Sequence, residues 1–311
     1  MLYSYFKIAR RNLFKHGFYS FVNVAGLLAG IAFALLIGAY VWGELQVNRQ
    51  LRHPDRQYLL TSRWKDPNMG LEITTLAPLG RKLKENYPHL VANYYRWDGL
   101  TSGVSKGDKH FRESIQLGDS TLLAMYGFEL LHGDARTALR DPYSVVITAP
   151  DALKYFGRTD VVGQTLTIQS FAGGKRAFAI TGVLPEIPEN SVTQITASIK
   201  NTFFIPTNTL AYFGRTDPED WNNTVWPSYL ELREGVTAAD LEKPIRQLIG
   251  QHAPEAIRQN LTVHAVPLRA YYLQKDGGLV KQMVTALTLV GVFVLLMAVV
   301  NFINLTVSRS G

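Results

Sequence analysis

One short string in this sequence has the spacing of a catalytic motif. Residues 103–107 (GVSKG) match the Gly-x-Ser-x-Gly pattern, with which a serine hydrolase presents its nucleophile on a turn between a buried strand and a helix. Polar turn residues precede Ser105 here, and the pattern at 110–117 predicts that a strand follows it. We therefore predict a hairpin turn at 103–107 and assign no catalytic residue.

Other sequence patterns for metal or nucleotide chemistry are missing. The seven histidines include no His-Glu-x-x-His pair, and the acidic cluster Asp217, Glu219 and Asp220 lacks the further oxygen ligands of a calcium loop. The sequence has no Gly-x-x-x-x-Gly-Lys-Ser/Thr loop to hold phosphates and no cysteine. We expect no cofactor, no metal site and no enzymatic activity in this chain.

Two long uncharged stretches, 17–43 and 282–308, enclose everything else. A bilayer core of roughly 30 Å is crossed by about 20 apolar residues of helix, so each stretch is long enough to span it. We predict a transmembrane helix at each, a folded domain over 44–281 on one side of the membrane, and a short end at 309–311.

Basic residues next to the spans indicate the orientation. Those before the first span are Lys7, Arg10, Arg11 and Lys15, and Arg309 follows the second. The positive-inside rule then places both chain ends in the cytoplasm and the domain outside, which in a bacterium means the periplasm or the cell exterior. The same residues account for much of the formal net charge of +7. Basic residues beside a span already have the anionic lipid bilayer as a partner, so we expect no nucleic-acid partner. Residues 1–16 form either an amphipathic segment in the headgroup region or a plain extension of the span.

Small residues recur every four positions along the first span and form a ridge that suits close helix packing in lipid. They are Gly26, Gly30, Ala34 and Gly38. The partner is either the second span or a helix of another chain. Asn301 and Asn304 in the second span are costly toward lipid, so we expect both to face protein or the interface.

The domain begins and ends with the same order of elements. A strand at 58–64, a helix at 78–87 and a strand at 91–97 are followed much later by a strand at 228–233, a helix at 241–251 that starts with a capping box, and a strand at 261–266. We predict an α+β membrane protein: a split βαβ porter-like subdomain, at about 50–100 and 228–270, with a mostly β subdomain inserted at about 101–227.

Several strings occur together in an order and spacing typical of one family. They are YFKIARRNL (5–13), FVNVAGL (21–27), SVVIT (144–148), KYFG (154–157), VGQTL (162–166), TGVLPEIPENS (181–191) and VNFINL (300–305). With them, nearly the whole chain resembles the N-terminal half of an FtsX-like, MacB-type ABC transporter permease. None of the strings is catalytic.

The resemblance implies a multi-pass protein of the bacterial inner membrane that pairs with a cytoplasmic ABC ATPase subunit and with a second permease copy. Its periplasmic domain is then expected to act on a periplasmic adaptor or on envelope cargo. Permeases of this family continue with further spans, so the chain is expected to be truncated or completed by another chain. Two alternatives share the two-span layout: a polysaccharide chain-length regulator, which would be dominated by helix outside the membrane, and a sensor input domain.

Overall fold

The computed structural model describes residues 17–188, 192–193 and 200–307, and it divides the chain into two units. We call Met1–Val47 together with Tyr272–Gly311 the helical unit, and Asn48–Tyr271 the sheet unit. The expected segment at 1–16, with Lys7, Arg10, Arg11 and Lys15, lies outside the described residues, as does the end at 309–311.

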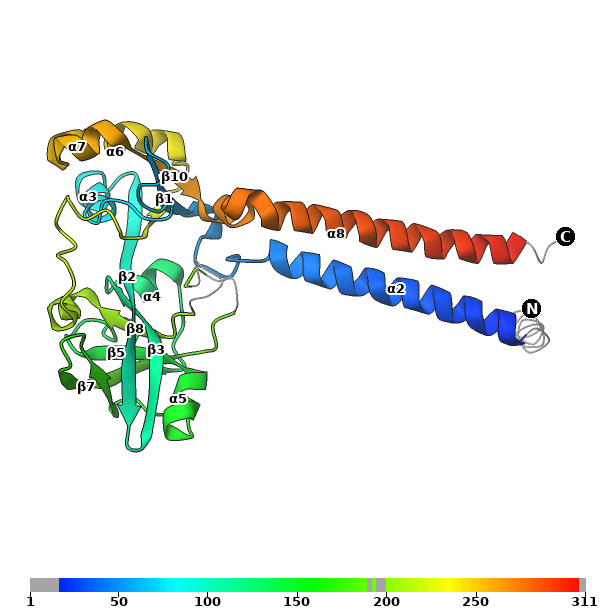
Figure 1. Ribbon diagram of the computed structural model, residues 1–311, viewed down its shortest axis with the longest axis horizontal. Coiled ribbons are helices and arrows are strands. Elements are labelled where there is room, and N and C mark those ends of the chain that lie inside the picture. Colours follow the sequence, from blue (N-terminus) through cyan, green and yellow to red (C-terminus); the bar gives the residue numbers. More distant parts are fainter. Residues whose placement is uncertain (1–16, 189–191, 194–199, 308–311) are drawn as a thin grey trace. The chain divides into compact units, whose positions relative to one another are not determined.

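The helical unit consists of α2 (Gly17–Leu45) and most of α8 (Leu268–Val307), which run alongside each other with the start of α2 and the end of α8 at the same end (Figure 1). Val24–Leu45 and Gly277–Ile303 are long and apolar enough to span a membrane, with mean hydropathies of 2.3 and 2.7. Large apolar side chains lie exposed along both, such as Leu35 at 68% and Leu289 at 67%. Lipid would cover these surfaces, because water-exposed apolar surface of this extent is unfavourable.

The α8 helix begins well before the span that the sequence predicts from 282 onward. Its start includes the polar residues Arg269, Gln274, Lys275 and Asp276, and Gly277 and Gly278 follow them with positive φ values of 71° and 80°. Glycine adopts such values without a steric penalty, so these two residues separate the polar start of the helix from its apolar span.

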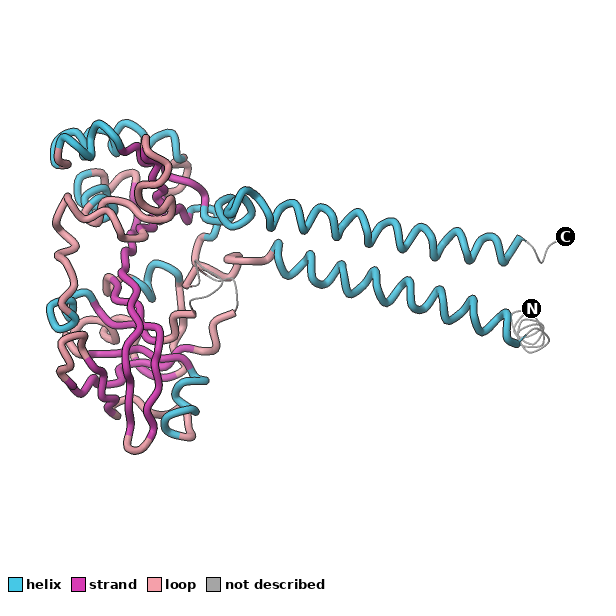
Figure 2. The backbone as a smooth tube through the Cα atoms, in the orientation of Figure 1, coloured by secondary structure: helices cyan, strands magenta, loops and turns pink. Residues whose placement is uncertain are grey.

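Strands and short helices make up the sheet unit (Figure 2). The strands follow the order β10-β1-β9-β2-β3-β8-β5-β7-β4, with β6 pairing to β2 and β7 off this path. We call β10, β1, β9 and the first part of β2 the terminal half of the sheet, because its strands come from the two ends of the unit. The remaining strands form the inserted half.

The terminal half is antiparallel and is covered on one face by two helices. Its elements are β1 (Gln57–Trp64), α3 (Leu79–Asn86), β2 (Val91–Lys106), β9 (Ser228–Leu232), α6 (Ala238–His252) and β10 (Leu261–Pro267). Leu83 of α3 and Leu241 and Ile245 of α6 pack with Leu60 and Leu230 of the sheet, all 1% exposed or less. The helix α6 starts with the expected capping box, in which the Thr237 N–H donates to Asp240 Oδ2 at 2.8 Å.

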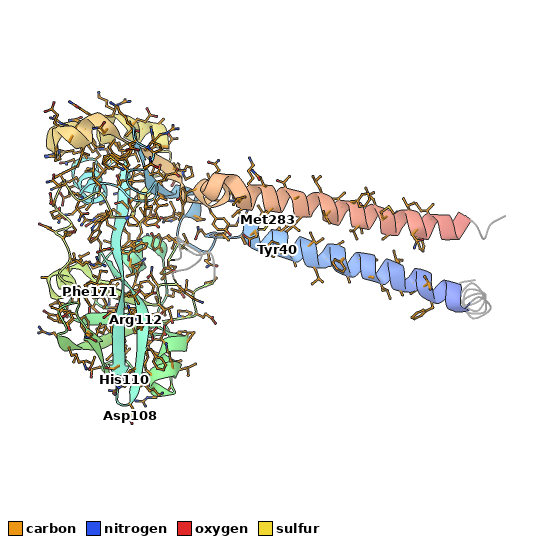
Figure 3. All side chains as sticks on the ribbon, in the orientation of Figure 1. Tyr40, Asp108, His110, Arg112, Phe171 and Met283 are labelled. Atoms are coloured by element: carbon orange, nitrogen blue, oxygen red, sulfur yellow. The ribbon has the colours of Figure 1, made fainter. Side chains whose placement is uncertain are left out.

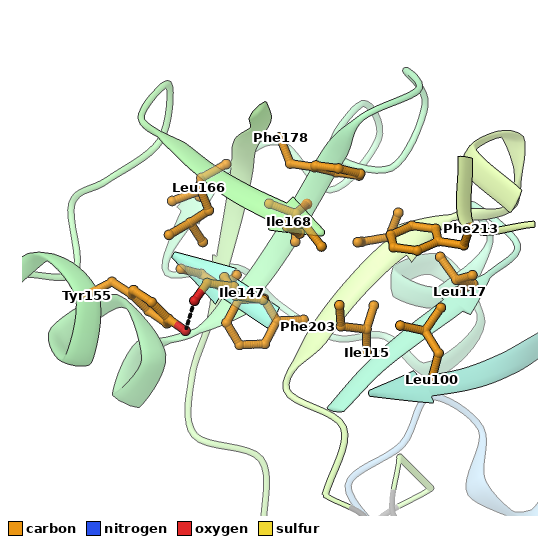
Figure 4. Close-up of a cluster of buried hydrophobic side chains, with 14 of the residues drawn as sticks. Leu100, Ile115, Leu117, Ile147, Tyr155, Leu166, Ile168, Phe178, Phe203 and Phe213 are labelled. Atoms are coloured by element: carbon orange, nitrogen blue, oxygen red, sulfur yellow. Dashed lines mark hydrogen bonds between the residues drawn. The ribbon is translucent and has the colours of Figure 1, made fainter. Parts of the chain in front are cut away.

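The inserted half is a mixed sheet in which β3 pairs with β8, and β5 with β7, in parallel. Its strands are β3 (Lys109–Gly118), β4 (His132–Gly133), β5 (Ser144–Thr148), β6 (Thr165–Gln169), β7 (Lys175–Leu184) and β8 (Phe203–Pro206). Its core combines aliphatic and aromatic side chains, among them Phe178 and Phe203 at 0% exposure (Figure 4). Short helices complete the sheet unit: η1 (Pro54–Arg56), α4 (Leu122–Tyr126), α5 (Ala149–Phe156), η2 (Thr207–Phe213) and α7 (Glu255–Asn260).

Strand β2 is longer than the sequence pattern indicates. It continues past Trp97 to Lys106, pairing with β9 over its first part and with β3 over its second, and so passes through both halves of the sheet. The turn that was expected to occupy 103–107 is therefore shorter: Gly103 and Ser105 lie within the strand, and only Gly107, at φ 55°, adopts a turn conformation. Pairing on both edges, to β3 and to β6, outweighs the low strand propensity of glycine and serine.

The predicted fold class is confirmed: two apolar helices flank an α+β domain with a split βαβ arrangement. The described part of the sheet unit contains no long coiled helix, which the alternative of a polysaccharide chain-length regulator requires.

Candidate functional site

Ser105, the serine of the catalytic-like string, lies in an ordinary strand pair. It is opposite His110 of β3, and its Oγ donates weakly to the carbonyl of Thr167 at 3.5 Å. No helix follows the string, since β3 starts at Lys109. The geometry of a serine-hydrolase nucleophile is therefore missing, and the hairpin that the sequence predicts is present.

The acidic cluster forms a hydrogen-bonded loop. Asp217 Oδ1 accepts from the backbone N–H of Glu219 at 2.8 Å, and Asp220 Oδ1 accepts from the N–H of Asn222 at 2.9 Å. Glu219 itself points to Arg81 and Arg96. Among the described residues no group of three or more histidine, aspartate or glutamate side chains is arranged to hold a metal ion.

The junction between the two halves of the sheet is held by Arg96, which sequence reasoning missed. Arg96 lies on β2 where its pairing passes from β9 to β3, and its side chain is only 2% exposed. Its Nε donates to Asp119 Oδ2 at 2.9 Å and its Nη2 donates to Asp119 Oδ1 at 3.1 Å. Such a bidentate pair is stronger and more directional than a single ionic contact.

Two further segments contact the same guanidinium. Its Nη1 donates to the carbonyls of Ala77 and Pro218, at 2.8 and 3.0 Å, and its Nη2 donates to Glu219 Oε1 at 3.1 Å. Burial alone would lower the pKa of Arg96, but Asp119 and Glu219 outweigh it, and the net effect raises the pKa. The guanidinium therefore stays charged and joins β2, the end of β3, the segment before α3 and the acidic loop. A basic residue among the aromatic residues of 94–97 was the available sequence signal.

In the helical unit, part of the predicted small-residue ridge lies against α8. A Cβ built on Gly30 would lie 3.0 Å from the Cβ of Ala298, and one built on Gly26 would lie 3.9 Å from Asn301 Nδ2. Ala34 is half-buried, whereas Gly38 is exposed and has nothing within 4 Å of its Cβ position. The side chain of Asn304 lies outside the described residues. The structure thus brings Gly26, Gly30 and Asn301 together and leaves Gly38 apart.

Two polar contacts join the helices nearer to the other end of the pair. Tyr40 Oη donates to Met283 Sδ at 3.8 Å (Figure 3), and Tyr272 Oη donates to Glu44 Oε2 in a short hydrogen bond. Burial raises the pKa of Tyr272 above the ordinary tyrosine value, with a further contribution from Glu44, so the hydroxyl remains a donor. Tyrosines of this kind are typical of the membrane–water interface, where the ring is apolar and the hydroxyl has a polar partner.

Comparison with known proteins gives one family. The sequence profile described as the MacB-like periplasmic core domain matches residues 20–248. No curated protein matches the chain.

Several solved structures are similar to this chain. A domain of a putative permease protein from Porphyromonas gingivalis aligns at 24% identity with a TM-score of 0.57, over 70% of this chain and 92% of that one. The periplasmic region of MacB from Actinobacillus actinomycetemcomitans aligns at 12% identity and a TM-score of 0.48, over 69% and 90%. The extracellular domain of the noncanonic ABC-type transporter YknZ from Gram-positive bacteria aligns at 15% identity and a TM-score of 0.45, over 67% and 98%. The first of these similarities shows a shared fold.

Proposed function

This chain belongs to the family of the MacB-like periplasmic core domain, and from that membership we propose that it supplies two membrane helices and the periplasmic domain of an ABC transporter permease. The observation that carries the proposal is the extent of the family match. It begins at residue 20, inside α2, and ends at residue 248, inside α6. It therefore includes both an apolar helix and most of the sheet unit.

The proposed location is the bacterial inner membrane, with the sheet unit in the periplasm. The two candidate spans, Val24–Leu45 and Gly277–Ile303, support insertion, and the basic residues before the first span support a cytoplasmic N-terminus. The lipid bilayer is then a permanent partner of α2 and α8.

In this proposal a separate cytoplasmic subunit binds and hydrolyses ATP, because this sequence contains no P-loop. The hydrolysis cycle moves the membrane helices, and these helices carry the motion to the periplasmic domain, which acts on an adaptor or on envelope cargo. The Arg96 junction supports this role, because an ion pair that joins four segments helps the two halves of the sheet to move as one body.

A second permease copy is part of the same proposal. Small residues on a transmembrane helix favour close contact with another helix, and Gly38 has open space around its Cβ position while Gly26 and Gly30 already lie against α8. We therefore assign the Gly38 side of α2 to a contact with another chain.

The experiment that tests the function starts from the DNA on both sides of this reading frame. A neighbouring gene for a P-loop ATPase would be co-expressed with the full chain, and ATP hydrolysis would be measured for the purified pair in lipid nanodiscs. We expect the two proteins to co-purify and the hydrolysis rate to depend on the chain. The control is the same ATPase with its P-loop lysine replaced by alanine. The absence of any neighbouring ATPase gene, or a hydrolysis rate that the chain does not affect, would contradict the proposal.

A further inference from the structure

A small hollow lies on the inserted half of the sheet, on the face turned away from its core. One row of residues crosses it from strand to strand: Arg112 of β3 is opposite Gly103 of β2, and Gln169 of β6 is opposite Lys175 of β7. A Cβ built on Gly103 would lie 3.3 Å from Gln169 Oε1, so the glutamine side chain lies beside the glycine. Arg112 therefore lies beside Gly103, which has no side chain, and Lys175 lies at the other end of the row, one strand beyond Gln169.

The next row repeats the arrangement with short polar residues. His110 of β3 is opposite Ser105 of β2, which is also paired with Thr167 of β6, and Ala177 of β7 follows. Together the two rows enclose a hollow of about 230 Å³. Its floor is made by Gly103, Ser105 and Thr167, and longer side chains surround this floor.

The lining of the hollow carries only one sign of charge. Arg112 and Lys175 are basic, His110 is a third nitrogen donor or acceptor, and Gln169 adds an amide. No aspartate or glutamate is among the described residues that line it. No ion pair within the described part of the chain involves Arg112, His110 or Lys175.

The acidic residues of this hairpin lie elsewhere. Because side chains alternate along a strand, Glu113 points to the opposite face from Arg112. There Glu113 is 8% exposed and accepts from Lys154 Nζ at 2.5 Å and from Tyr155 Oη at 2.7 Å. Figure 3 places Asp108 at the tip of the hairpin, beyond His110 and Arg112 on β3. The positive charges at the hollow are therefore not neutralised by these two carboxylates.

From this geometry we propose that the hollow binds a phosphate-bearing group, held by Arg112 and Lys175 with Ser105, Thr167 and Gln169 as hydrogen-bond partners. The planar fork of arginine matches the oxygens of a phosphate, and lysine adds a point charge on the other side. The volume suits a small group, since pockets for drug-sized ligands have about 300–1,000 Å³. Two basic side chains on either side of one small space favour a doubly charged phosphate monoester over a single carboxylate.

This binding site goes beyond the proposed transport function and does not depend on it. The phosphate group could belong to a soluble ester or to a lipid headgroup, and both present the same oxygens. The site is tested first with inorganic phosphate, by isothermal titration calorimetry on the full chain in detergent at low salt. We expect saturable binding that weakens as sodium chloride is added, because the site is open to solvent and its charges are screened.

Four variants separate this site from general surface charge. Arg112→Gln and Lys175→Gln each remove one charge, and each is expected to weaken phosphate binding about tenfold or more, as loss of a charged hydrogen bond does. Arg158→Gln and Lys243→Gln remove exposed charges that do not line the hollow, and binding should be unchanged. Equal losses in all four, or no phosphate binding to the unaltered chain, would overturn the proposal.

A steric variant tests the hollow without altering any charge. Gly103→Val places a branched side chain on the floor, in a strand position where valine is favoured. We expect phosphate binding to be lost while the far-UV circular dichroism spectrum is kept. If this variant does not fold, the two charge variants decide the question alone. If it folds and binds phosphate as before, the hollow is not the site.

The source of the phosphate is distinguished in two arms. Glycerol 3-phosphate is tested as a competitor of inorganic phosphate, and the full chain in phosphatidylcholine nanodiscs is tested for flotation with vesicles of phosphatidylcholine containing phosphatidic acid. Competition without flotation assigns a soluble ester. Flotation that requires phosphatidic acid and is lost in Arg112→Gln assigns a headgroup. Neither competition nor flotation would contradict a phosphate-ester site.

Discussion

Arg96 and Asp119 form a two-point ion pair in the interior of the sheet unit, with both side chains 8% exposed or less. Arg96 comes from β2 and Asp119 directly follows β3, so the pair lies one residue beyond the Trp97–Gly118 pairing of these two strands. The backbone N–H of Arg96 also donates to Asp119 Oδ2 at 3.0 Å. Asp119 is thus fully engaged by one residue, through both the side chain and the main chain.

Replacing Arg96 with methionine should destabilise the sheet unit strongly. The variant keeps most of the side-chain volume but leaves Asp119 buried without its partner, and breaking one side of a buried pair costs about 3–5 kcal/mol. Urea unfolding of the full chain in detergent measures the change. The control is Arg136→Met, because Arg136 pairs with Asp134 on the surface and its loss should have no measurable effect. Equal stability of the two variants would contradict the structural role of Arg96.

The contributions of Asp151 and Asp240 to folding stability should change with pH in opposite directions. Burial raises the pKa of Asp151, so its contribution to stability is present below the unfolded value of 3.8 and is lost as the pH rises through the higher folded value. Hydrogen bonds from the Thr237 backbone and side chain lower the pKa of Asp240, so its contribution is present above 3.8 and is lost as the pH falls through the folded value.

The matching variants are Asp151→Asn and Asp240→Asn, with melting temperatures compared at about pH 7 and about pH 3. At neutral pH Asp151→Asn should melt above the unaltered chain, since the amide still accepts from Thr148 Oγ1, which lies 2.7 Å from Asp151 Oδ2. Asp240→Asn should melt below it. Both differences should shrink at the lower pH, and shifts of the same sign at pH 7 would refute the assignment.

The contact between α2 and α8 should be sensitive to the size of residue 30. Gly30→Leu brings new atoms against Ala298, and overpacking of this kind typically costs about 1–3 kcal/mol. Cysteines at Tyr40 and Met283, introduced into a chain that has none, report the contact through the yield of a short bifunctional thiol crosslinker. Gly43→Leu is the matched control, because nothing lies within 4 Å of its Cβ position. A crosslinking yield that falls equally in both variants would contradict the placement of residue 30 at the contact between α2 and α8.

If α2 meets a second copy through its open side, a single cysteine at Gly38 should crosslink two chains. We expect oxidation of Gly38→Cys in membranes to give a disulfide-linked dimer on non-reducing gels. Gly26→Cys, whose Cβ position lies 3.9 Å from Asn301 Nδ2 on α8, should give much less. A dimer that forms equally from both positions, or from neither, would argue against this interface.

Truncating Phe203, in the core of the inserted half, should lower the free energy of unfolding far more than truncating Phe171 on the surface. Phe203 is 0% exposed and packs edge to face with Tyr155, so Phe203→Ala should lose about 3–5 kcal/mol. Phe171 is 59% exposed, and Phe171→Ala should lose far less. Urea unfolding compares the two, and a loss at Phe171 as large as that at Phe203 would contradict the placement of the core.

The elements that sequence patterns predict well are those with strong local signals. β1, α3, β9, α6 and β10 are all found close to their expected bounds, because alternating apolar residues and a capping box specify them locally. The predicted end of β2 at residue 97 was wrong, and so was most of the turn predicted at 103–107, because Gly103 and Gly107 indicate a turn when they are considered without their pairing partners. The pairing that keeps this stretch extended comes from β3 and β6, and the β6 residues lie far along the chain.

The site features divide in the same way. The basic residues before the first span and the small-residue ridge can be recognised in the sequence. The orientation and the helix packing that they indicate stay predictions. Arg96 was missed because its partners are distant, with Asp119 23 residues and Glu219 123 residues away. The basic hollow was missed for a related reason: it exists only when four strands place Arg112 and Lys175 on one face.

The pairing of β1 with β10 has a consequence for how the chain must fold. Thr61 and His264 are joined across these strands although they are 203 residues apart. During synthesis, β1 emerges long before its partners β9 and β10, and until then both of its edges expose unpaired backbone groups, which invite pairing with other chains. Sheets closed by such distant strands fold slowly. Folding of this unit is therefore completed only after residue 267 has been synthesised, and a chaperone that shields β1 meanwhile would raise the yield.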